Sequence, residues 1–135
     1  MKVFVAAPLF NEAERAFNAQ TAKTLRDNGF EVWLAQEAPF IQHGNHKEKR
    51  MIYDSDILAL KTSDVIVAVL DGAEVDAGVA YEMGYAKALG KSLVGLKTDY
   101  RTFSGMEEVN LMLAVSVSAL CKSISEVIDF LSKTK

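Results

Sequence analysis

The fold is decided by the stretch Asp64-Val65-Ile66-Val67-Ala68-Val69-Leu70, an apolar run of strand length. A run without polar alternation predicts a strand buried on both faces, as in a parallel sheet covered by helices. Asp71-Gly72 predicts a turn at the end of this strand, and Asp76 is expected to cap a helix that runs to Leu89. The stretch and its surroundings therefore indicate the α/β class.

Apolar runs of strand length and segments of helical period alternate along the rest of the chain. Further strands are expected at Val3–Ala7, Phe30–Leu34, Ser92–Leu96 and about Val115–Leu120. Further helices are expected from Asn11 to Asn28, from about Glu48 to Lys61, from Glu107 to Ala114 and after Ser123. Right-handed crossovers then predict one flavodoxin-like (Rossmann-like) domain over residues 1–135, with five parallel strands in the order 2-1-3-4-5 and helices on both faces.

The composition is that of an average soluble domain, with 50% hydrophobic and 24% charged residues among 135. This length can bury a core without disulfides, and the single cysteine, Cys121, is expected to be buried in a reducing compartment. Eighteen acidic against fifteen basic residues argue against a nucleic-acid polymer as partner. The apolar start ends at Pro8, too early for a signal peptide or a membrane span, so we expect a soluble cytoplasmic protein.

The least regular stretch runs from Ala35 to Lys47 and holds both histidines, His43 and His46. We interpret it as a long loop, and long loops in compact domains are usually functional or disordered. No cysteine or carboxylate stands at a convincing metal-ligand spacing from either histidine. We therefore expect no metal site there.

In an open sheet of this order, ligands bind at the carboxyl ends of the strands, near the switch point between the first and third strands. The site is therefore expected around Ala7–Phe10 and Asp71–Glu82. The first of these segments contains no glycine, which excludes a dinucleotide fingerprint and a phosphate-binding loop. Pro8 instead turns the chain and is expected to shape the floor of a pocket.

Glu82 is the candidate reactive group, because small or apolar residues surround it and Gly78, one helical turn earlier, leaves space over its carboxylate. Such a carboxylate is poised as a nucleophile or a base, and the alternative is a solvated surface glutamate. Asp76 can contact a ligand while it caps its helix. Composition alone favours an exposed helical acid for Asp56, and Asn110 is expected to cap a helix.

Four sequence blocks follow one another along nearly the whole chain, and the third is the specific one. The blocks are Ala7-Pro8-Leu9-Phe10 followed by Asn11-Glu12-Ala13-Glu14-Arg15; Asp56 before Asp64-Val65-Ile66-Val67-Ala68; Asp76-x-Gly78-x-Ala80-x-Glu82-x-Gly84-x-Ala86 followed by Gly90-Lys91; and Asn110-Leu111-Met112. In this combination the chain resembles the nucleoside 2-deoxyribosyltransferases.

The resemblance implies an enzyme of nucleotide salvage that transfers a 2-deoxyribosyl group between nucleobases. Glu82 would attack C1′ of a 2′-deoxynucleoside, and an incoming base would displace it from the covalent deoxyribosyl-enzyme with overall retention. Asp56 and Asp76 would hold the nucleobase, and one of them would protonate it as it leaves. Asn110 would reach the sugar 5′-hydroxyl from a neighbouring subunit, which implies a homo-oligomer with shared sites.

The resemblance also implies a set of further substrate-binding residues. These are Pro8, Leu9, Phe10, Gly78 and Met112. It implies no metal ion and no organic cofactor, and its small-molecule partners are deoxynucleosides and free nucleobases. Tyr53, Tyr81 and Tyr85 stay open as the residue that orients Glu82.

Two other functions compete with transfer on the same residues. One is hydrolysis of a 2′-deoxynucleoside 5′-monophosphate by an N-glycosidase, for which Arg101 and Ser104 are the candidate phosphate contacts. Transfer is preferred because Asn110 suits a neutral 5′-hydroxyl better than a phosphate. The other is a nucleoside-binding module without catalysis. A phospho-receiver is excluded because Ala6-Ala7-Pro8 lacks the acidic pair that holds magnesium after the first strand.

Overall fold

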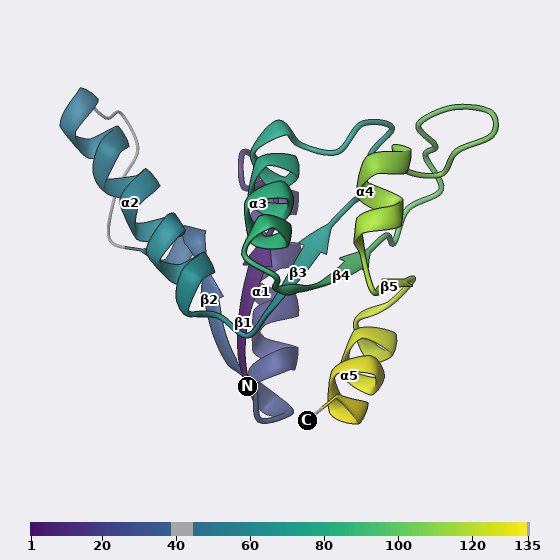
Figure 1. Cartoon of the computed structure of the whole chain (residues 1–135), viewed down its shortest axis with the longest axis horizontal. Helices are drawn as coiled ribbons and strands as arrows, with labels where there is room; N and C mark the ends of the chain where they lie inside the picture. Colours follow the sequence, from purple (N-terminus) through teal and green to yellow (C-terminus); the bar gives the residue numbers. More distant parts are fainter. Residues whose placement is uncertain (39–44, 135) are drawn as a thin grey trace.

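The computed structural model describes residues 1–38 and 45–134, and these contain a five-stranded parallel sheet (Figure 1). The strands are β1 (Lys2–Ala6), β2 (Glu31–Leu34), β3 (Val65–Val69), β4 (Ser92–Leu96) and β5 (Ala119–Cys121). They lie in the order β2-β1-β3-β4-β5 and every neighbouring pair is parallel. The predicted fold class and strand order are thereby confirmed.

Helices cover both faces of the sheet in the described part of the chain. They are α1 (Glu12–Asp27), α2 (His46–Thr62), α3 (Ala77–Ala88), α4 (Leu111–Ser116) and α5 (Ile124–Lys133), with a short 3-10 turn at Ala35–Glu37. Apolar residues of α1 and α5 pack on one face, and those of α2, α3 and α4 pack on the other. Figure 1 shows α2 and α3 as neighbours, with the start of α2 projecting beyond the sheet.

The two cores follow from the alternation of side chains along the central strands. In β1, Val3 and Val5 face α1 and α5, whereas Phe4 and Ala6 face α2 and α3. All five residues of β3 are buried, as expected for a strand covered on both faces. The continuous apolar run that decided the fold therefore supplies both cores at once.

Polar caps set where the helices begin, and one of them corrects the prediction for α2. The side chain of Asn45 accepts a hydrogen bond from the backbone N–H of Glu48, whose carboxylate accepts one from the backbone N–H of Asn45. This capping box starts α2 at His46, two residues before the expected start. The expected loop from Ala35 to Lys47 is correspondingly shorter, and His43 lies outside the described residues.

The prediction was also wrong about the segment between β4 and α5. Asn110 caps a helix as expected, because its side chain accepts from the backbone N–H of Met112 at 3.0 Å. This cap starts α4 at Leu111, and the helix continues to Ser116. Val115, expected to begin a strand, is 79% exposed on the helix, so β5 is confined to Ala119–Cys121.

Cys121 is 4% exposed, which confirms its expected burial. Within the described residues, every helix is too short or too polar to cross a bilayer.

Candidate active site

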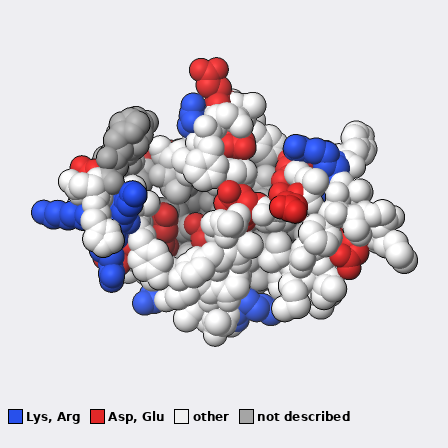
Figure 2. All heavy atoms as spheres, turned by 90° about the horizontal axis from the view of Figure 1, so that it is seen from above, with Lys and Arg blue, Asp and Glu red and all other residues white. Residues whose placement is uncertain are grey.

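A cavity of about 380 Å³ lies between α2 and α3, within the size range of small-molecule sites. It is lined by Lys49, Ile52, Tyr53, Asp56, Ile57, Leu60, Gly78, Tyr81 and Glu82. Figure 2 looks down on the carboxyl edge of the sheet and shows acidic side chains around a hollow on this face. The cavity is therefore largely apolar, with two carboxylates among its walls.

Asp56 and Glu82 reach this cavity from different helices. Asp56 stands on α2 and Glu82 on α3, 26 positions apart in the chain, and both are half-buried. The interpretation of Asp56 as an exposed helical acid is thus wrong, because packing of α2 against α3 turns it inward. Neither residue is a solvated surface acid.

The charge state of Glu82 follows from its surroundings. Burial, together with the nearby carboxylates of Asp56 and Asp76, raises the pKa of Glu82 from 4.5 to about 8. The pKa of Asp56 is also raised by burial, while the indole N–H of Trp33 acts in the opposite direction. At neutral pH Glu82 therefore keeps a proton of its own.

Asp76 lies beside the cavity at the start of α3, where its carboxylate oxygen accepts from the backbone N–H of Val79 at 3.1 Å. The predicted cap is thereby confirmed. A Cβ atom at Gly78 would stand 3.0 Å from this same Asp76 oxygen. Gly78 lines the cavity together with Glu82, and because it has no side chain the space beside Asp76 stays free.

Two tyrosines form one rim of the cavity. The hydroxyls of Tyr53 on α2 and Tyr81 on α3 hydrogen bond to each other at 2.8 Å. Tyr85 stacks on Tyr81, with 6.2 Å between ring centroids, but it is not among the lining residues. Of the three tyrosines left open by the sequence, Tyr53 and Tyr81 are therefore the two that line the cavity with Glu82.

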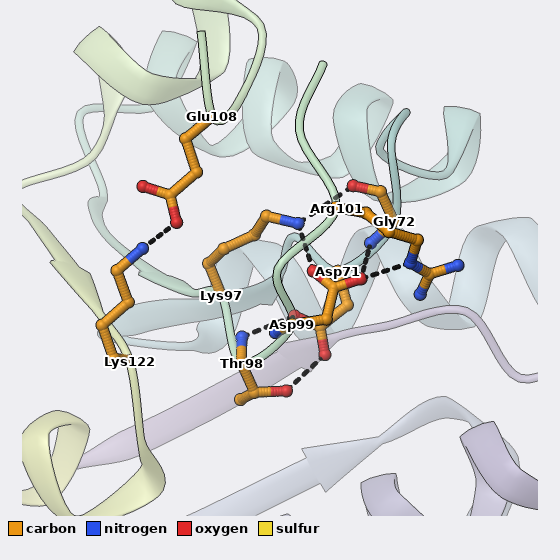
Figure 3. Close-up of polar contacts among 8 residues, drawn as sticks. All are labelled: Asp71, Gly72, Lys97, Thr98, Asp99, Arg101, Glu108 and Lys122. Carbon is orange, nitrogen blue, oxygen red and sulfur yellow. Dashed lines mark hydrogen bonds and ion pairs between the residues drawn. The ribbon is translucent and has the colours of Figure 1, made fainter. Parts of the chain in front are cut away.

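A network of charged groups holds the loop that leads from β3 to Asp76, and sequence reasoning missed it (Figure 3). The side chain of Lys97, just after β4, is wholly buried; its ammonium donates to the Gly72 carbonyl at 2.9 Å and to Asp99. Asp99 in turn accepts from the Gly72 N–H at 3.0 Å and from Arg101. The sequence signal that could have revealed this network is a lysine, Lys97, directly after the apolar run of β4.

The same network sets the ionisation of Asp99. Burial would raise its pKa, but hydrogen bonds from Lys97, Arg101 and the Gly72 backbone outweigh burial and lower the pKa to about 2. Asp71 adds a second clamp by accepting from both the N–H and the hydroxyl of Thr98 at 2.6 Å. The loop that carries Asp76 is therefore tied firmly to β4.

Other predicted site residues lie away from this cavity within the chain. Pro8 and Leu9 are half-buried and Phe10 is exposed, and none of them is among the lining residues. Asn110 lines a separate hollow of about 300 Å³ together with Glu74, Val75, Ala80, Phe103 and Leu113. Met112 is 72% exposed on α4.

The candidate phosphate contacts are engaged elsewhere. Arg101 is exposed and pairs with Asp99, and the hydroxyl of Ser104 accepts from the backbone N–H groups of Met106 and Glu107. Lys49, which sequence reasoning did not single out, is the cation in the lining of the cavity. Among the described residues, no group of three or more histidine, cysteine or acidic side chains is arranged to hold a metal ion.

Comparison with known proteins gives a consistent result. Residues 3–122 match the family model described as nucleoside 2-deoxyribosyltransferase. The chain is 31% identical over 133 residues to a nucleoside deoxyribosyltransferase from Limosilactobacillus fermentum, an alignment that covers 87% of this chain and 76% of that protein.

Solved structures share the fold along nearly the whole chain. The 2-deoxyribosyltransferase from Bacillus psychrosaccharolyticus superimposes with a TM-score of 0.83 at 25% identity, covering 96% of this chain and 91% of its own. A CMP N-glycosidase from Clostridium botulinum superimposes with a TM-score of 0.63 at 20% identity, covering 98% and 99% of the two chains. At that identity the second likeness concerns the fold alone.

Proposed function

Because this chain belongs to the nucleoside 2-deoxyribosyltransferase family, we propose that it transfers the 2-deoxyribosyl group of a 2′-deoxynucleoside from one nucleobase to another. The observation that carries this proposal is the cavity in which Asp56 and Glu82 face each other, with Asp76 at its side. Its volume suits a nucleoside, and its apolar walls suit the faces of a base and a sugar. Nucleotide salvage in the cytoplasm is the proposed setting.

In the proposed first half-reaction, an oxygen of Glu82 forms a bond to C1′ while the bond from C1′ to the base nitrogen breaks. The leaving nitrogen takes up a proton, and Asp56 or Asp76 delivers it. In the second half-reaction, a nitrogen of the incoming base attacks C1′ and the bond from C1′ to Glu82 breaks. The proton of that nitrogen passes to the aspartate, Asp56 or Asp76, that donated a proton in the first half. Two displacements on the same carbon retain its configuration.

The proton held by Glu82 supports this sequence of steps. Glu82 has a pKa of about 8 and must lose its proton before it can attack. Transfer of that proton to Asp56 or Asp76 ionises Glu82, the nucleophile, and at the same time protonates the aspartate that acts as general acid. No proton then has to be supplied by solvent, which suits a pocket that must keep water away from the covalent intermediate.

The proposed site is shared between subunits. Asn110 and Met112 lie outside the cavity of their own chain, as residues that serve a neighbour would. Around them the surface is apolar, with Met106 98% exposed and Leu111 and Val115 exposed on α4. Large exposed apolar patches are typical of protein interfaces, which supports a homo-oligomer.

Hydrolysis of a 2′-deoxynucleoside 5′-monophosphate is the second candidate, and the position of Lys49 favours it. Its side chain lines the cavity that holds Asp56 and Glu82, where an ammonium group can donate hydrogen bonds to a phosphate. In that reaction water, rather than a second base, would attack C1′. The products would be a free base and deoxyribose 5-phosphate.

The test is base exchange by the purified full chain. Deoxyinosine with adenine should give deoxyadenosine and hypoxanthine, and Glu82→Ala should abolish the exchange while circular dichroism stays unchanged. Asp129→Ala, which removes an exposed acid of α5 on the opposite face of the sheet, is the control. A 2′-fluoro-2′-deoxynucleoside should leave a covalent adduct on Glu82, seen by mass spectrometry of the intact protein.

Each competing function gives a different result in the same assay. Release of deoxyribose 5-phosphate from a deoxynucleoside monophosphate without base exchange would establish the N-glycosidase instead. Saturable nucleoside binding without turnover would establish the binding module.

A further inference from the structure

Trp33, the only tryptophan of the chain, has an indole N–H that finds no hydrogen-bond partner in the part of the chain that the structure describes. It lies in β2 and packs against the core formed by β1, α2 and α3. Its Nε1 atom is fully buried and finds no acceptor among the described residues. Buried donors are nearly always paired, so this one calls for a physical reason.

Asp56 supplies that reason. The indole N–H faces the Asp56 carboxyl closely enough to favour its ionised form, although the pair does not meet the geometry of a hydrogen bond. Asp56 lines the cavity, whereas Trp33 is not among the lining residues. Adjustment of one carboxyl group is therefore enough to pair the donor.

We propose that Trp33 is a positioning residue that donates its indole N–H to one oxygen of Asp56 and so directs the other oxygen to the bound nucleobase. This proposal rests on the proposed function only in taking the nucleobase as the group that Asp56 contacts. A hydrogen bond to a carboxylate is stronger than one between neutral groups, and an indole held in a packed core has little freedom to rotate. Because Trp33 belongs to β2, the sheet thus fixes the orientation of the Asp56 carboxyl on α2.

This arrangement also favours one chemical class of ligand group. When Asp56 is ionised, the form that the indole N–H favours against the effect of burial, its carboxylate accepts hydrogen bonds and does not donate them. Asp56 would therefore recognise a base through an N–H, such as an exocyclic amino group or a ring N–H. The other titratable groups facing the same cavity are Glu82, Lys49, Tyr53 and Tyr81.

A single tryptophan makes the interaction directly visible. In the ¹⁵N-labelled full chain, the one indole N–H resonance should move with pH in a step whose apparent pKa lies above the ordinary 3.8 of an aspartate. Asp56→Asn should remove that step. Asp54→Asn, two residues away on the same helix and exposed, should leave it unchanged.

Two outcomes of this titration would overturn the proposal. One is a step that persists in Asp56→Asn and disappears in Glu82→Gln, which would mean that the indole senses the other carboxyl. The other is a resonance that stays constant between pH 3 and pH 9. Neither measurement needs turnover, so failure of the proposed function leaves the proposal testable.

Activity provides the second readout. Trp33→Phe keeps an aromatic ring in the core but removes the donor, so kcat/KM should fall about tenfold, the equivalent of one hydrogen bond. The acid limb of its pH profile should move to higher pH, because Asp56 loses a group that favours ionisation. In an Asp56→Asn background the same change should cost nothing further. Loss of thermal stability with an unchanged pH profile would reduce Trp33 to a core-filling residue.

Discussion

Glu82→Gln should make the protein more stable at neutral and alkaline pH, although it removes the proposed nucleophile. The pKa of Glu82 is raised from 4.5 to about 8 in the folded state by burial and by the carboxylates of Asp56 and Asp76. Between these two pH values the folded chain keeps a proton that the unfolded chain has released. Stability therefore falls as pH rises through this window and levels off above pH 8.

The magnitude follows from the width of the window. Each pH unit corresponds to about 1.4 kcal/mol, so burying the Glu82 carboxyl costs at most about 3 kcal/mol at pH 7. Water entering the open cavity screens the charge and reduces the cost, which leaves an expected gain of about 2 kcal/mol for the variant. Glutamine has nearly the same volume and stays neutral at every pH, so it escapes this cost. For a chain of this size the gain is a rise of roughly 6–8 °C in Tm.

Urea unfolding followed by circular dichroism at pH 4.5, 5.5, 7 and 8.5 measures the effect. The difference between Glu82→Gln and the unmodified chain should be close to zero at pH 4.5 and should grow with pH. Glu74→Gln, which changes an exposed carboxylate in the loop before α3, should show no such trend. A difference that is constant across the series, or a less stable Glu82→Gln at pH 8.5, would refute the electrostatic reasoning.

Three further outcomes are expected from the same structure. Asp99→Ala leaves the ammonium of Lys97 buried without its carboxylate, so the free energy of unfolding in urea should fall by about 3 kcal/mol; a loss below about 1 kcal/mol would mean that water replaces the partner. Gly78→Ala places a methyl group 3.0 Å from the neighbouring carboxylate, so exchange activity should fall about tenfold while stability changes by less than about 1 kcal/mol; full activity would show that the space is not used. Mixing two inactive variants, Asn110→Ala and Glu82→Ala, should restore part of the activity, because some mixed sites receive both native residues; no recovery after subunit exchange would place both residues in one chain's own site.

The sheet could be predicted from sequence because burial on two faces leaves a local signature. The continuous apolar run of β3 and the shorter runs of the other strands are readable without any knowledge of contacts. The helix boundaries that polar N-cap residues set were harder to predict. Asn45 starts α2 earlier than expected, and Asn110 starts α4 and thereby displaces β5, because a single side-chain hydrogen bond decides each boundary.

The site was only partly readable. Gly78 and Glu82 share one helical turn, and Asp76 caps the same helix, so periodicity alone relates them. Trp33 and Lys97 could not be found this way, since each acts on a partner that lies on another element: Trp33 on Asp56, and Lys97 on the loop after β3. Their roles depend on packing between elements, which has no sequence period.

The sequence by itself determined the α/β class, the strand order and the helix that presents Asp76, Gly78 and Glu82 together, because these depend on local burial patterns and caps. Only the tertiary structure decided that Asp56 turns into the same cavity and that Glu82 keeps its proton at neutral pH. The physical reason is that a pKa and the direction of a side chain depend on desolvation and on charges from other elements, and these exist only once α2 and α3 have packed on the sheet.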